Sequence, residues 1–532
     1  MSVLIFLIIS YILLSISLYK VFEKAGVESW KALVPFYNLV VCCEIIGRPQ
    51  WWALLLLVPI VNIFIYVGIC VDVVRSFNRL DFKDTALAVV YAPIAFFMIG
   101  NNKDDKYVGQ TVKLEQEYAK KMMAAKDAKD ERLFNKLDAT NPYKKSVSRE
   151  WVEAIVFAVF AAAFIRMFLI EAYVIPTSSM EGSLLVGDFL FVSKAHYGIR
   201  TPMTVAMLPL VHNTVPLVGT ESYLKNPSLG YHRLPSIQEV QRNEPVVFNY
   251  PEGDSIYITS ERNFSYHDIR RAGPNAMARF RNQTLRVRPI DKKDHYIKRC
   301  VGLPGDKFEI RDRQIYINDQ PTENPKNLQF NYVITSPSPI PSSRWRDLGV
   351  NLTELAANER SSQSGIYSFA LNAEQVETIR SWNDNIQVDF RPISQQSPNY
   401  LFPHDPANFP GWTVDNFGPF VIPAEGTTVT ITPKNIAMYR RIIGVYENNE
   451  LVVKNGRIFI NGEQTTQYTF KQDYFWMMGD NRHNSEDSRV WGFAPEDHIV
   501  GKPLFIWFST RNGSIWNGIN WNRIFSSAYK MD

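Results

Sequence analysis

Cysteine is scarce in this sequence: four occur in 532 residues, and only Cys300 lies after residue 100. Cys42, Cys43 and Cys70 lie in an apolar region near the N-terminus. A single thiol excludes an internal disulfide in the long C-terminal part, and no spacing resembles that of paired zinc ligands. We therefore expect a C-terminal part held together by its own core, and its cysteine content is compatible with an oxidising compartment.

An excess of charge of one sign is also lacking, because 57 lysines and arginines face 53 aspartates and glutamates, a formal net charge of +4. Proteins that bind nucleic acid usually concentrate a basic excess. We therefore expect no nucleic-acid partner. The length allows roughly three or four domains.

Three long stretches carry no charged side chain: residues 1–19, 51–70 and 85–100. A bilayer core requires apolar spans of about 17–25 residues. Residues 1–19 lack the basic start and the small-residue cleavage site of a secretory signal, so we expect an uncleaved helix there. Residues 51–70 form the clearest span. The sequence thus predicts an N-terminal transmembrane region over residues 1–100, of about three helices.

A charged segment follows, with 12 basic and 9 acidic residues between 101 and 150. Its basic end, Lys144, Lys145 and Arg149, directly precedes another apolar stretch. The positive-inside rule then predicts a cytoplasmic linker at 101–150, a transmembrane anchor helix at 151–172 and an extracytoplasmic domain at 173–532. The expected location is the cytoplasmic (inner) membrane, with several passes.

The pattern after residue 173 is mainly that of β structure. Apolar runs rich in β-branched and aromatic residues predict strands at 188–194, 244–251 and 502–509. Hairpins are predicted at 307–319 and 450–463, the second with an Asn-Gly turn. Helices are predicted at 372–382 and 432–447, the latter with Thr432 as N-cap and Pro433 in its first turn. Loops are expected at 335–343 and 393–410. The predicted fold is a multi-pass α-helical membrane region followed by a mainly β ectodomain with α+β insertions at about 200–240 and 320–470.

Three segments carry candidate chemistry: "YVIPTSSMEGSLLVGDFLFVSK" (173–194), "DHYIKRCVGLPGD" (294–306) and "YFWMMGDNRHNSEDSRVWGF" (474–493). Each is weak alone. In this order, behind a membrane anchor, they resemble the type I signal peptidases (leader peptidases), membrane-bound serine proteases that remove secretory signal peptides. The resemblance covers roughly residues 150–200, 244–254, 291–318 and 474–509. It implies a long form of the family, with additional N-terminal membrane segments and ectodomain insertions.

The resemblance implies a Ser/Lys dyad at Ser179 and Lys298. A serine hydroxyl is a poor nucleophile unless a base takes its proton. A lysine can be that base only if burial brings its pKa down from about 10.4 towards the working pH. The apolar neighbours Ile297 and Val301 suit such burial.

The same resemblance implies supporting roles. The Thr177 hydroxyl and the Ser179 backbone N–H form the oxyanion hole, each donor being worth about 3 kcal/mol. Ser485 orients the lysine through a hydrogen bond, and Asp487 pairs with Arg299. The remaining polar side chains of the third segment are expected to brace its loop: Asp480, Asn481, Arg482 and Arg489.

The sequence departs from the family pattern in two places. The usual Met-x-Pro after the nucleophile is Met180-Glu181-Gly182 here, which affects how the leaving side of the substrate is held. His483 stands where the family often has Asp, and a loop histidine is the simpler interpretation.

The expected activity is cleavage of signal peptides after small residues one and three positions before the cut, with no metal or cofactor. Expected partners are the signal peptides of secretory preproteins, the lipid bilayer and the secretion translocon. One alternative is a Ser-His protease using His295 or His483. Another is a catalytically idle membrane scaffold that retains the fold, against which both proposed catalytic residues argue.

Overall fold

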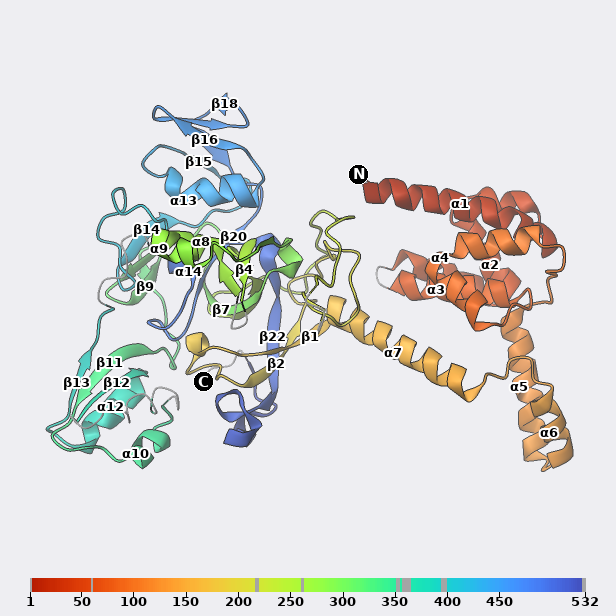
Figure 1. Ribbon diagram of the computed structural model, residues 1–532, viewed down its shortest axis with the longest axis horizontal. Coiled ribbons are helices and arrows are strands. Elements are labelled where there is room, and N and C mark those ends of the chain that lie inside the picture. The colour runs from red at the N-terminus through yellow and green to blue at the C-terminus, as the bar shows by residue number, and fades with distance from the viewer. Residues whose placement is uncertain are drawn as a thin grey trace. The chain divides into compact units, whose positions relative to one another are not determined.

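The computed structural model describes residues 2–58, 61–215, 220–259, 263–350, 355, 365–393 and 400–528. The chain divides into two compact units, Met1–Val159 and Phe160–Asp532 (Figure 1). Part of the predicted loop at 393–410, residues 394–399, lies outside the described residues.

The first unit is helical. It contains α1 (Ser2–Lys24), α2 (Tyr37–Ile46), α3 (Val61–Arg75), α4 (Phe82–Asn101), α5 (Thr111–Asp127) and α6 (Glu131–Ala139), with the 3₁₀ helices η1 (Ser29–Leu33) and η2 (Gln50–Leu57). Helix α4 packs on α1 and α3. Buried apolar side chains such as Phe22, Cys43 and Phe96 form one core among these helices. Helix α7 (Val147–Phe168) leads from this unit into the second.

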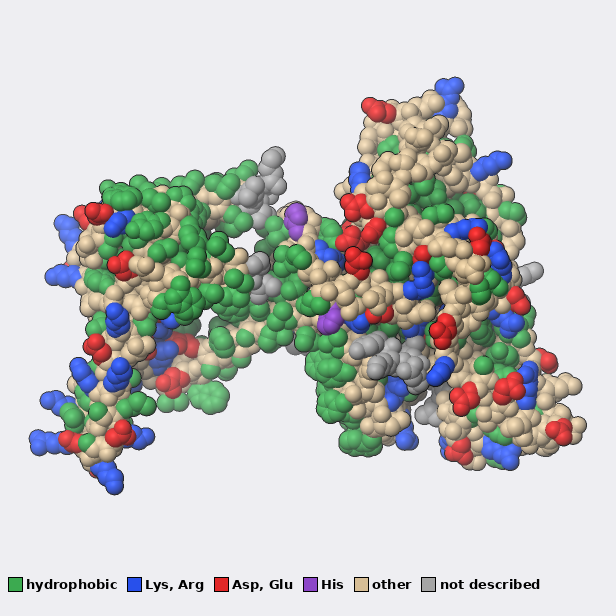
Figure 2. Space-filling view, turned by 180° about the vertical axis from the view of Figure 1, so that it is seen from behind, with side chains coloured by type: hydrophobic (Ala, Val, Ile, Leu, Met, Phe, Trp, Pro, Cys, Tyr) green, Lys and Arg blue, Asp and Glu red, His purple; other side chains and the backbone are tan. Residues whose placement is uncertain are grey.

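Three helical segments are long and apolar enough to cross a membrane: Ile5–Lys24, Phe82–Asn101 and Val147–Phe168. They coincide with the apolar stretches at 1–19 and 85–100 and with the predicted anchor. Large apolar side chains such as Phe6 and Phe157 stay exposed on α1 and α7. Figure 2 shows hydrophobic side chains over much of the surface of the helical unit. Exposed apolar surface of this extent is typical of lipid-facing helices.

Residues 51–70, predicted as the clearest single span, are not one helix. The structure has η2 up to Leu57, extended backbone at Val58 (φ −87°, ψ 114°) and α3 from Val61. The sequence places Pro59 directly after Val58. A proline pushes the residue before it out of the helical region, so the apolar run is divided there.

The second unit is mainly β. Its largest sheet is antiparallel, in the order β1-β2-β22-β3-β7-β20-β21 (Figure 1). Its strands are β1 (Ile170–Val174), β2 (Asp188–Ser193), β3 (Pro245–Asn249), β7 (His295–Gly302), β20 (Tyr474–Met478), β21 (Ala494–Pro495) and β22 (Ile499–Ser509). All residues of β3 and β20 are buried, so the middle of this sheet is covered on both faces.

Smaller sheets surround this one. Their strands are β4 (Ser255–Ile258), β5 (Asn263–Ser265), β6 (Leu285–Val287), β8 (Lys307–Arg311), β9 (Gln314–Ile317), β10 (Gln320–Pro321), β14 (Phe417–Val421), β15 (Thr428–Thr430), β16 (Leu451–Lys454), β17 (Arg457–Ile460), β18 (Glu463–Gln464) and β19 (Gln467–Thr469). The short helices are α8 (Tyr266–Arg271), α9 (Pro274–Arg279), α13 (Ile436–Arg441) and α14 (Ser488–Trp491). The 3₁₀ turns are η3 (Ser178–Met180), η4 (Ile290–Lys292), η7 (Glu496–His498), η8 (Arg511–Gly513), η9 (Ile515–Asn517) and η10 (Trp521–Arg523).

One insertion folds around a core of its own. Strands β11 (Phe330–Thr335), β12 (Ile366–Leu371) and β13 (Gln387–Phe390) form a separate sheet in the order β12-β11-β13. Helices α10 (Ser342–Asp347) and α12 (Ala373–Trp382) accompany it, and Trp345, Phe369 and Ile379 are buried in its core. This insertion is an α+β subdomain within the predicted 320–470 region.

The local predictions for the ectodomain hold with two exceptions. The first predicted insertion, at about 200–240, is not α+β, because its described residues (200–215 and 220–240) form isolated β-bridges and no helix or strand. Both hairpins form, and the Asn455-Gly456 turn has φ of 52° and 70°, as a tight hairpin turn requires. The helix predicted from Thr432 begins only at Ile436, with Asn435 at the N-cap. The cause is local, because Thr432 and Asn435 hydrogen-bond each other and form a turn first. The segment Ile442–Tyr446 continues as π-helix.

Candidate active site

Ser179 lies on a single tight turn after the first strand of the large sheet. The chain leaves β1, passes through Thr177 in extended conformation and turns at η3. Met180 is buried in an apolar cluster with Ile175 and Leu184, which anchors the turn. Ser179 is 8% exposed, so the turn presents a nearly buried hydroxyl.

Lys298 reaches this hydroxyl from the middle of the sheet. It lies on β7, between β3 and β20, and is 4% exposed. Its Nζ donates hydrogen bonds to Ser179 Oγ at 2.6 Å and to the Ile297 carbonyl at 3.1 Å. The sheet therefore joins residues from two segments far apart in the sequence, the pair predicted as a dyad.

The surroundings of Lys298 shift its pKa in the direction that a general base needs. Burial lowers the pKa of Lys298 to about 8, while the carboxylates Asp487, Glu486 and Asp480 act in the opposite direction. The ring of Tyr296 lies 5.5 Å from Nζ. A lysine with this pKa is partly neutral near neutral pH, as a general base must be.

A pocket of about 430 Å³ opens over the pair. The chain before the nucleophile, strand β7 and the 483–486 loop supply its walls. Thr177 lines the pocket and is exposed, and within the described ranges its hydroxyl has no hydrogen-bond partner. That hydroxyl is therefore available to a ligand in the pocket.

The predicted pairing of Asp487 with Arg299 is corrected by the structure. Asp480 takes that place, accepting from Arg299 Nε at 2.7 Å and Nη2 at 2.6 Å. Asp487 instead accepts from Arg489 Nε at 2.9 Å and Nη2 at 2.8 Å, and from the Gly479 N–H at 3.1 Å. Asp480 lies next to the end of β20, the strand paired with β7, so the sheet register brings it to Arg299.

The loop after β20 is braced by buried arginines, as predicted for Arg482 and Arg489. The same prediction is wrong for the Asn481 side chain, whose buried amide has no hydrogen-bond partner among the described residues. Arg489 Nη2 donates to the Arg482 carbonyl at 2.6 Å, and Arg482 Nε donates to the Gly479 carbonyl at 3.2 Å. The Asn481 N–H donates to the Ser179 carbonyl at 3.1 Å. The loop is thus tied both to itself and to the turn that carries Ser179.

The hydrogen bond predicted from Ser485 to Lys298 is not formed. The Ser485 hydroxyl is buried, and the hydrogen bonds that Lys298 Nζ makes in the described structure go to Ser179 and the Ile297 carbonyl. It occupies the space beside Gly479, where an added Cβ would lie 2.3 Å from this hydroxyl and 2.4 Å from the Ser179 carbonyl. Gly479 therefore lets the loop approach the nucleophile closely.

The structure explains why glycine stands at position 182, where the family pattern has proline. Gly182 has φ of 91°, and a Cβ there would lie 2.5 Å from the Asn327 carbonyl. A proline, with φ near about −65°, cannot adopt this conformation. Asn327 belongs to the segment that leads into the inserted subdomain, so glycine at 182 accommodates the insertion.

The two ring nitrogens of His483 are both engaged away from the nucleophile. Nε2 pairs with Asp415 at 2.9 Å, and Nδ1 accepts from the Asn331 N–H at 3.3 Å. The ring packs against Phe330 and Phe390. His483 thus attaches the inserted strand β11 to the loop.

His295 packs in a stack of rings beside the pocket. Its ring centroid lies 5.0 Å from that of Tyr173 and 5.3 Å from that of His212. Burial lowers the pKa of His295 to about 3, so the ring is neutral. The hydrogen bond that Ser179 Oγ makes in the described structure is with Lys298.

The described part of the chain contains no group of three or more His, Cys, Asp or Glu side chains able to hold a metal ion. The sequence analysis assigned no role to Glu486 and Tyr400, which also line the pocket. Glu486 lies inside the third motif, so its position was a usable signal. Tyr400 comes from the insertion, and no local pattern could connect it to the site.

The sequence model of the family described as signal peptidase, peptidase S26, matches residues 148–354 and 421–508. The match omits residues 355–420, which include β12, α12 and β13 of the inserted subdomain. A family of unknown function matches residues 30–110 in the helical unit.

Curated proteins similar to this chain are named signal peptidase I. The protein of Buchnera aphidicola from Baizongia pistaciae is 23% identical over 402 residues, covering 73% of this chain and 90% of its own length. The protein of Buchnera aphidicola from Acyrthosiphon pisum is 26% identical over 378 residues, covering 70% of this chain and 79% of its own length. The protein of Haemophilus influenzae is 24% identical over 380 residues, covering 70% of this chain and 73% of its own length.

Proposed function

Because this chain belongs to the signal peptidase family, peptidase S26, we propose that it cleaves signal peptides from secretory preproteins with Ser179 as nucleophile and Lys298 as general base. The family makes it a serine protease. The observation that carries the assignment of the dyad is the contact of 2.6 Å between Lys298 Nζ and Ser179 Oγ, two nearly buried groups at the base of an open pocket.

In the first step Ser179 Oγ attacks the scissile carbonyl carbon while the neutral Lys298 amine takes the hydroxyl proton. The Thr177 hydroxyl and the Ser179 backbone N–H donate to the oxyanion that forms. The Lys298 ammonium then gives its proton to the leaving amine, the new N-terminus of the mature protein, and an ester to Ser179 remains.

In the second step water replaces the amine. Lys298 takes a proton from this water, the hydroxide attacks the ester carbonyl, and the oxyanion forms again at the same donors. Collapse returns the proton from Lys298 to Ser179 Oγ and releases the signal peptide as a carboxylic acid, which then loses its proton to water. Apolar walls such as Ile175, Leu190 and Ile297 in the pocket fit small side chains before the cut.

The membrane arrangement is part of the proposal. Residues 1–100 and 151–172 hold the spans, residues 101–150 stay in the cytoplasm, and the domain from 173 lies outside it. The basic residues Lys144, Lys145 and Arg149 before α7 support this orientation. Preproteins emerging from the secretion translocon would then meet the site on the outer side of the cytoplasmic membrane.

The test is a preprotein cleavage assay on the full-length protein, with N-terminal sequencing of the product. Wild type is expected to give one new N-terminus behind small residues, and Ser179→Ala and Lys298→Met no product. Ser178→Ala is the matched control, because Ser178 lies beside the nucleophile and binds Asn484 instead. Full activity in Lys298→Met would exclude the dyad. Failure of the wild-type protein to cleave any preprotein, with Ser179→Ala indistinguishable from it, would support an idle scaffold.

A further inference from the structure

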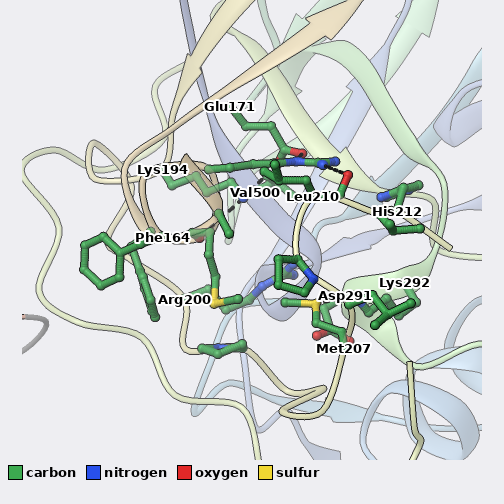
Figure 3. A pocket seen from close by; sticks show the side chains of 18 of the residues that line it. Phe164, Glu171, Lys194, Arg200, Met207, Leu210, His212, Asp291, Lys292 and Val500 are labelled. Carbon is green, nitrogen blue, oxygen red and sulfur yellow. Dashed lines mark hydrogen bonds and ion pairs between the residues drawn. The ribbon is translucent and has the colours of Figure 1, made fainter. Parts of the chain in front are cut away.

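A second pocket, of about 350 Å³, lies within the C-terminal unit at the end of α7 (Figure 3). The last turns of α7, from Phe160 to Phe168, form one side of it. A loop that runs from Pro202 to His212, within the first predicted insertion, forms another. The pocket therefore lies where a helix able to cross a membrane enters the polar domain.

The lining of this pocket carries more positive than negative charge. Its cations are Arg166, Lys194, Arg200 and Lys292, and its carboxylates are Glu171 and Asp291. The two histidines of the lining add no charge, because burial lowers the pKa of His212 and that of His295. Figure 3 shows Lys194, Arg200 and Lys292 lining one pocket, with Asp291 and Met207 beside Lys292.

The two carboxylates are already engaged. Glu171 pairs with Arg166 at 2.7 Å and Lys194 at 2.8 Å. Asp291 accepts hydrogen bonds from the backbone N–H and the hydroxyl of Thr204, both at 2.8 Å.

The other two cations have only neutral acceptors among the described residues. Arg200 donates to the Asp497 carbonyl and to Asn249 Oδ1, each at 2.8 Å. Lys292 Nζ lies 2.9 Å from the thioether sulfur of Met207 and 5.3 Å from the centroid of the Tyr223 ring.

Lys292 is the strongest indication of a missing partner. It is 5% exposed, and a thioether is a weak acceptor. Burying an ammonium group without a direct partner is costly, and the nearby Asp291 carboxylate, which attracts it, is hydrogen-bonded to Thr204. An anion in the pocket would supply Lys292 with that direct partner. A phosphate group fits best, since it accepts charge-assisted hydrogen bonds from both guanidinium and ammonium donors.

We propose that this pocket binds an anionic phosphate group, held by Lys292 and Arg200. Phosphatidylglycerol-type lipids and free phosphate share this chemistry. The rim favours the lipid, because Val205, Leu208 and Leu210 of the loop and Phe160 of α7 are exposed apolar side chains around a charged interior. A lipid headgroup would enter the pocket while its acyl chains lie along α7.

The experiment uses the full-length protein in detergent micelles and counts bound lipid by native mass spectrometry. Phosphatidylglycerol is compared with phosphatidylcholine, whose phosphate is neutralised by its own choline. A parallel titration with inorganic phosphate, followed by isothermal calorimetry, distinguishes the free anion. We expect one phosphatidylglycerol to bind about tenfold or more tightly than phosphatidylcholine.

Lys292→Met should abolish this preference and still fold, because it replaces a buried ammonium by an apolar chain of similar length. Lys292→Arg should keep it. Lys307→Met is the matched control, since Lys307 is exposed and paired with Asp319 on another sheet. A circular dichroism spectrum checks that each variant is folded.

Saturable binding of phosphatidylglycerol, lost only in Lys292→Met, supports the site with a lipid as its ligand. Saturable binding of inorganic phosphate with the same dependence on Lys292 and no lipid preference supports the site with the free anion. Wild type without preference and without phosphate binding would overturn the proposal. So would an equal loss in Lys307→Met, because that result indicates general charge attraction.

Discussion

Lys298 and Lys307 come from the same stretch of sequence, and their surroundings give them opposite properties. Lys307 is exposed and pairs with Asp319 at 2.9 Å. Lys298 is enclosed by β3 and β20 and meets a hydroxyl instead of a carboxylate. Because the buried charge loses its hydration, burial lowers the pKa of Lys298 to about 8. The same residue type is thus a surface charge in one place and a candidate base in the other.

The pH dependence of cleavage follows from this residue. Below its pKa of about 8 Lys298 is mostly protonated and cannot accept the Ser179 proton, so kcat/KM should rise as the pH rises through that value. Lys298→Arg should lose about 10³-fold or more, since arginine stays protonated. Initial rates on a preprotein below and above the pKa measure both. A profile that is flat across this range would contradict the assignment.

The ion pair between Arg299 and Asp480 also belongs to the residue scale. Both side chains are buried, so Asp480→Asn removes the carboxylate from a guanidinium charge that cannot return to water. We expect the free energy of unfolding to fall by about 3–5 kcal/mol. Denaturant titration of the full-length protein in detergent gives the value.

Asp319→Asn is the control for that prediction, because it removes an exposed partner of Lys307. Screening by water makes such pairs weak, and its midpoint should stay close to that of wild type. Equal shifts in Asp480→Asn and Asp319→Asn would refute a special role for the buried pair.

At the scale of elements, the inserted subdomain is connected to the catalytic loop through its backbone. The Gln329 N–H donates to the Asp480 carbonyl and the Arg482 N–H to the Gln329 carbonyl, both at 2.9 Å. This parallel bridge continues the loop into β11. The insertion therefore buttresses the loop that contacts Ser179, and is more than a surface addition.

Gln329→Pro tests this connection. Proline has no N–H, so the bond to Asp480 is lost while the core of the subdomain, around Trp345 and Phe369, is untouched. We expect kcat to fall about tenfold through misplacement of the loop, with a smaller change in KM. The cleavage assay with varied preprotein concentration separates the two.

Gln329→Ala is the matched control at the same position. It keeps the backbone N–H and removes a side chain whose buried Oε1 has no hydrogen-bond partner in the described structure. Its kcat should stay within about twofold of wild type. If Gln329→Pro and Gln329→Ala behave alike, the backbone bridge does not position the loop.

At the scale of the whole molecule, the small net charge of the chain is the sum over two units that differ in surface composition. The helical unit and its linker carry exposed apolar surface and clustered charges, whereas the large unit is a nearly neutral β structure. The 101–150 linker, with 12 basic and 9 acidic residues, contains α5 and α6. The proposed orientation puts this basic excess in the cytoplasm.

Cysteine labelling tests that orientation. All four native cysteines are buried, so an introduced cysteine on the surface should be labelled selectively. Asp127→Cys in α5 and Asp389→Cys in β13 are both exposed positions. In intact cells stripped of their outer barrier, a membrane-impermeant maleimide should label Asp389→Cys at once and Asp127→Cys only after lysis. The reverse pattern would invert the topology.

The sequence alone was sufficient for the properties that depend on neighbouring residues. Apolar runs identified helices long and apolar enough to cross a membrane at 1–19, at 85–100 and at the predicted anchor, and alternation identified strands such as β2, β3 and β22. Three motifs in order identified the family. They also singled out Ser179 and Lys298, which lie within hydrogen-bond distance in the structure and whose catalytic roles are part of the proposal. These features survive because they arise from local periodicity and from side-chain chemistry that the motif itself carries.

Only the tertiary structure decided the pairings between distant segments. The register of β20 against β7 places Asp480 beside Arg299, so that these two residues form an ion pair. Asp487 pairs with Arg489 instead. The close approach at Gly479 brings the Ser485 hydroxyl beside the turn of Ser179 without a hydrogen bond to Lys298, and the insertion accounts for Gly182. Such contacts depend on strand register and packing over large sequence separations, and no local pattern encodes them.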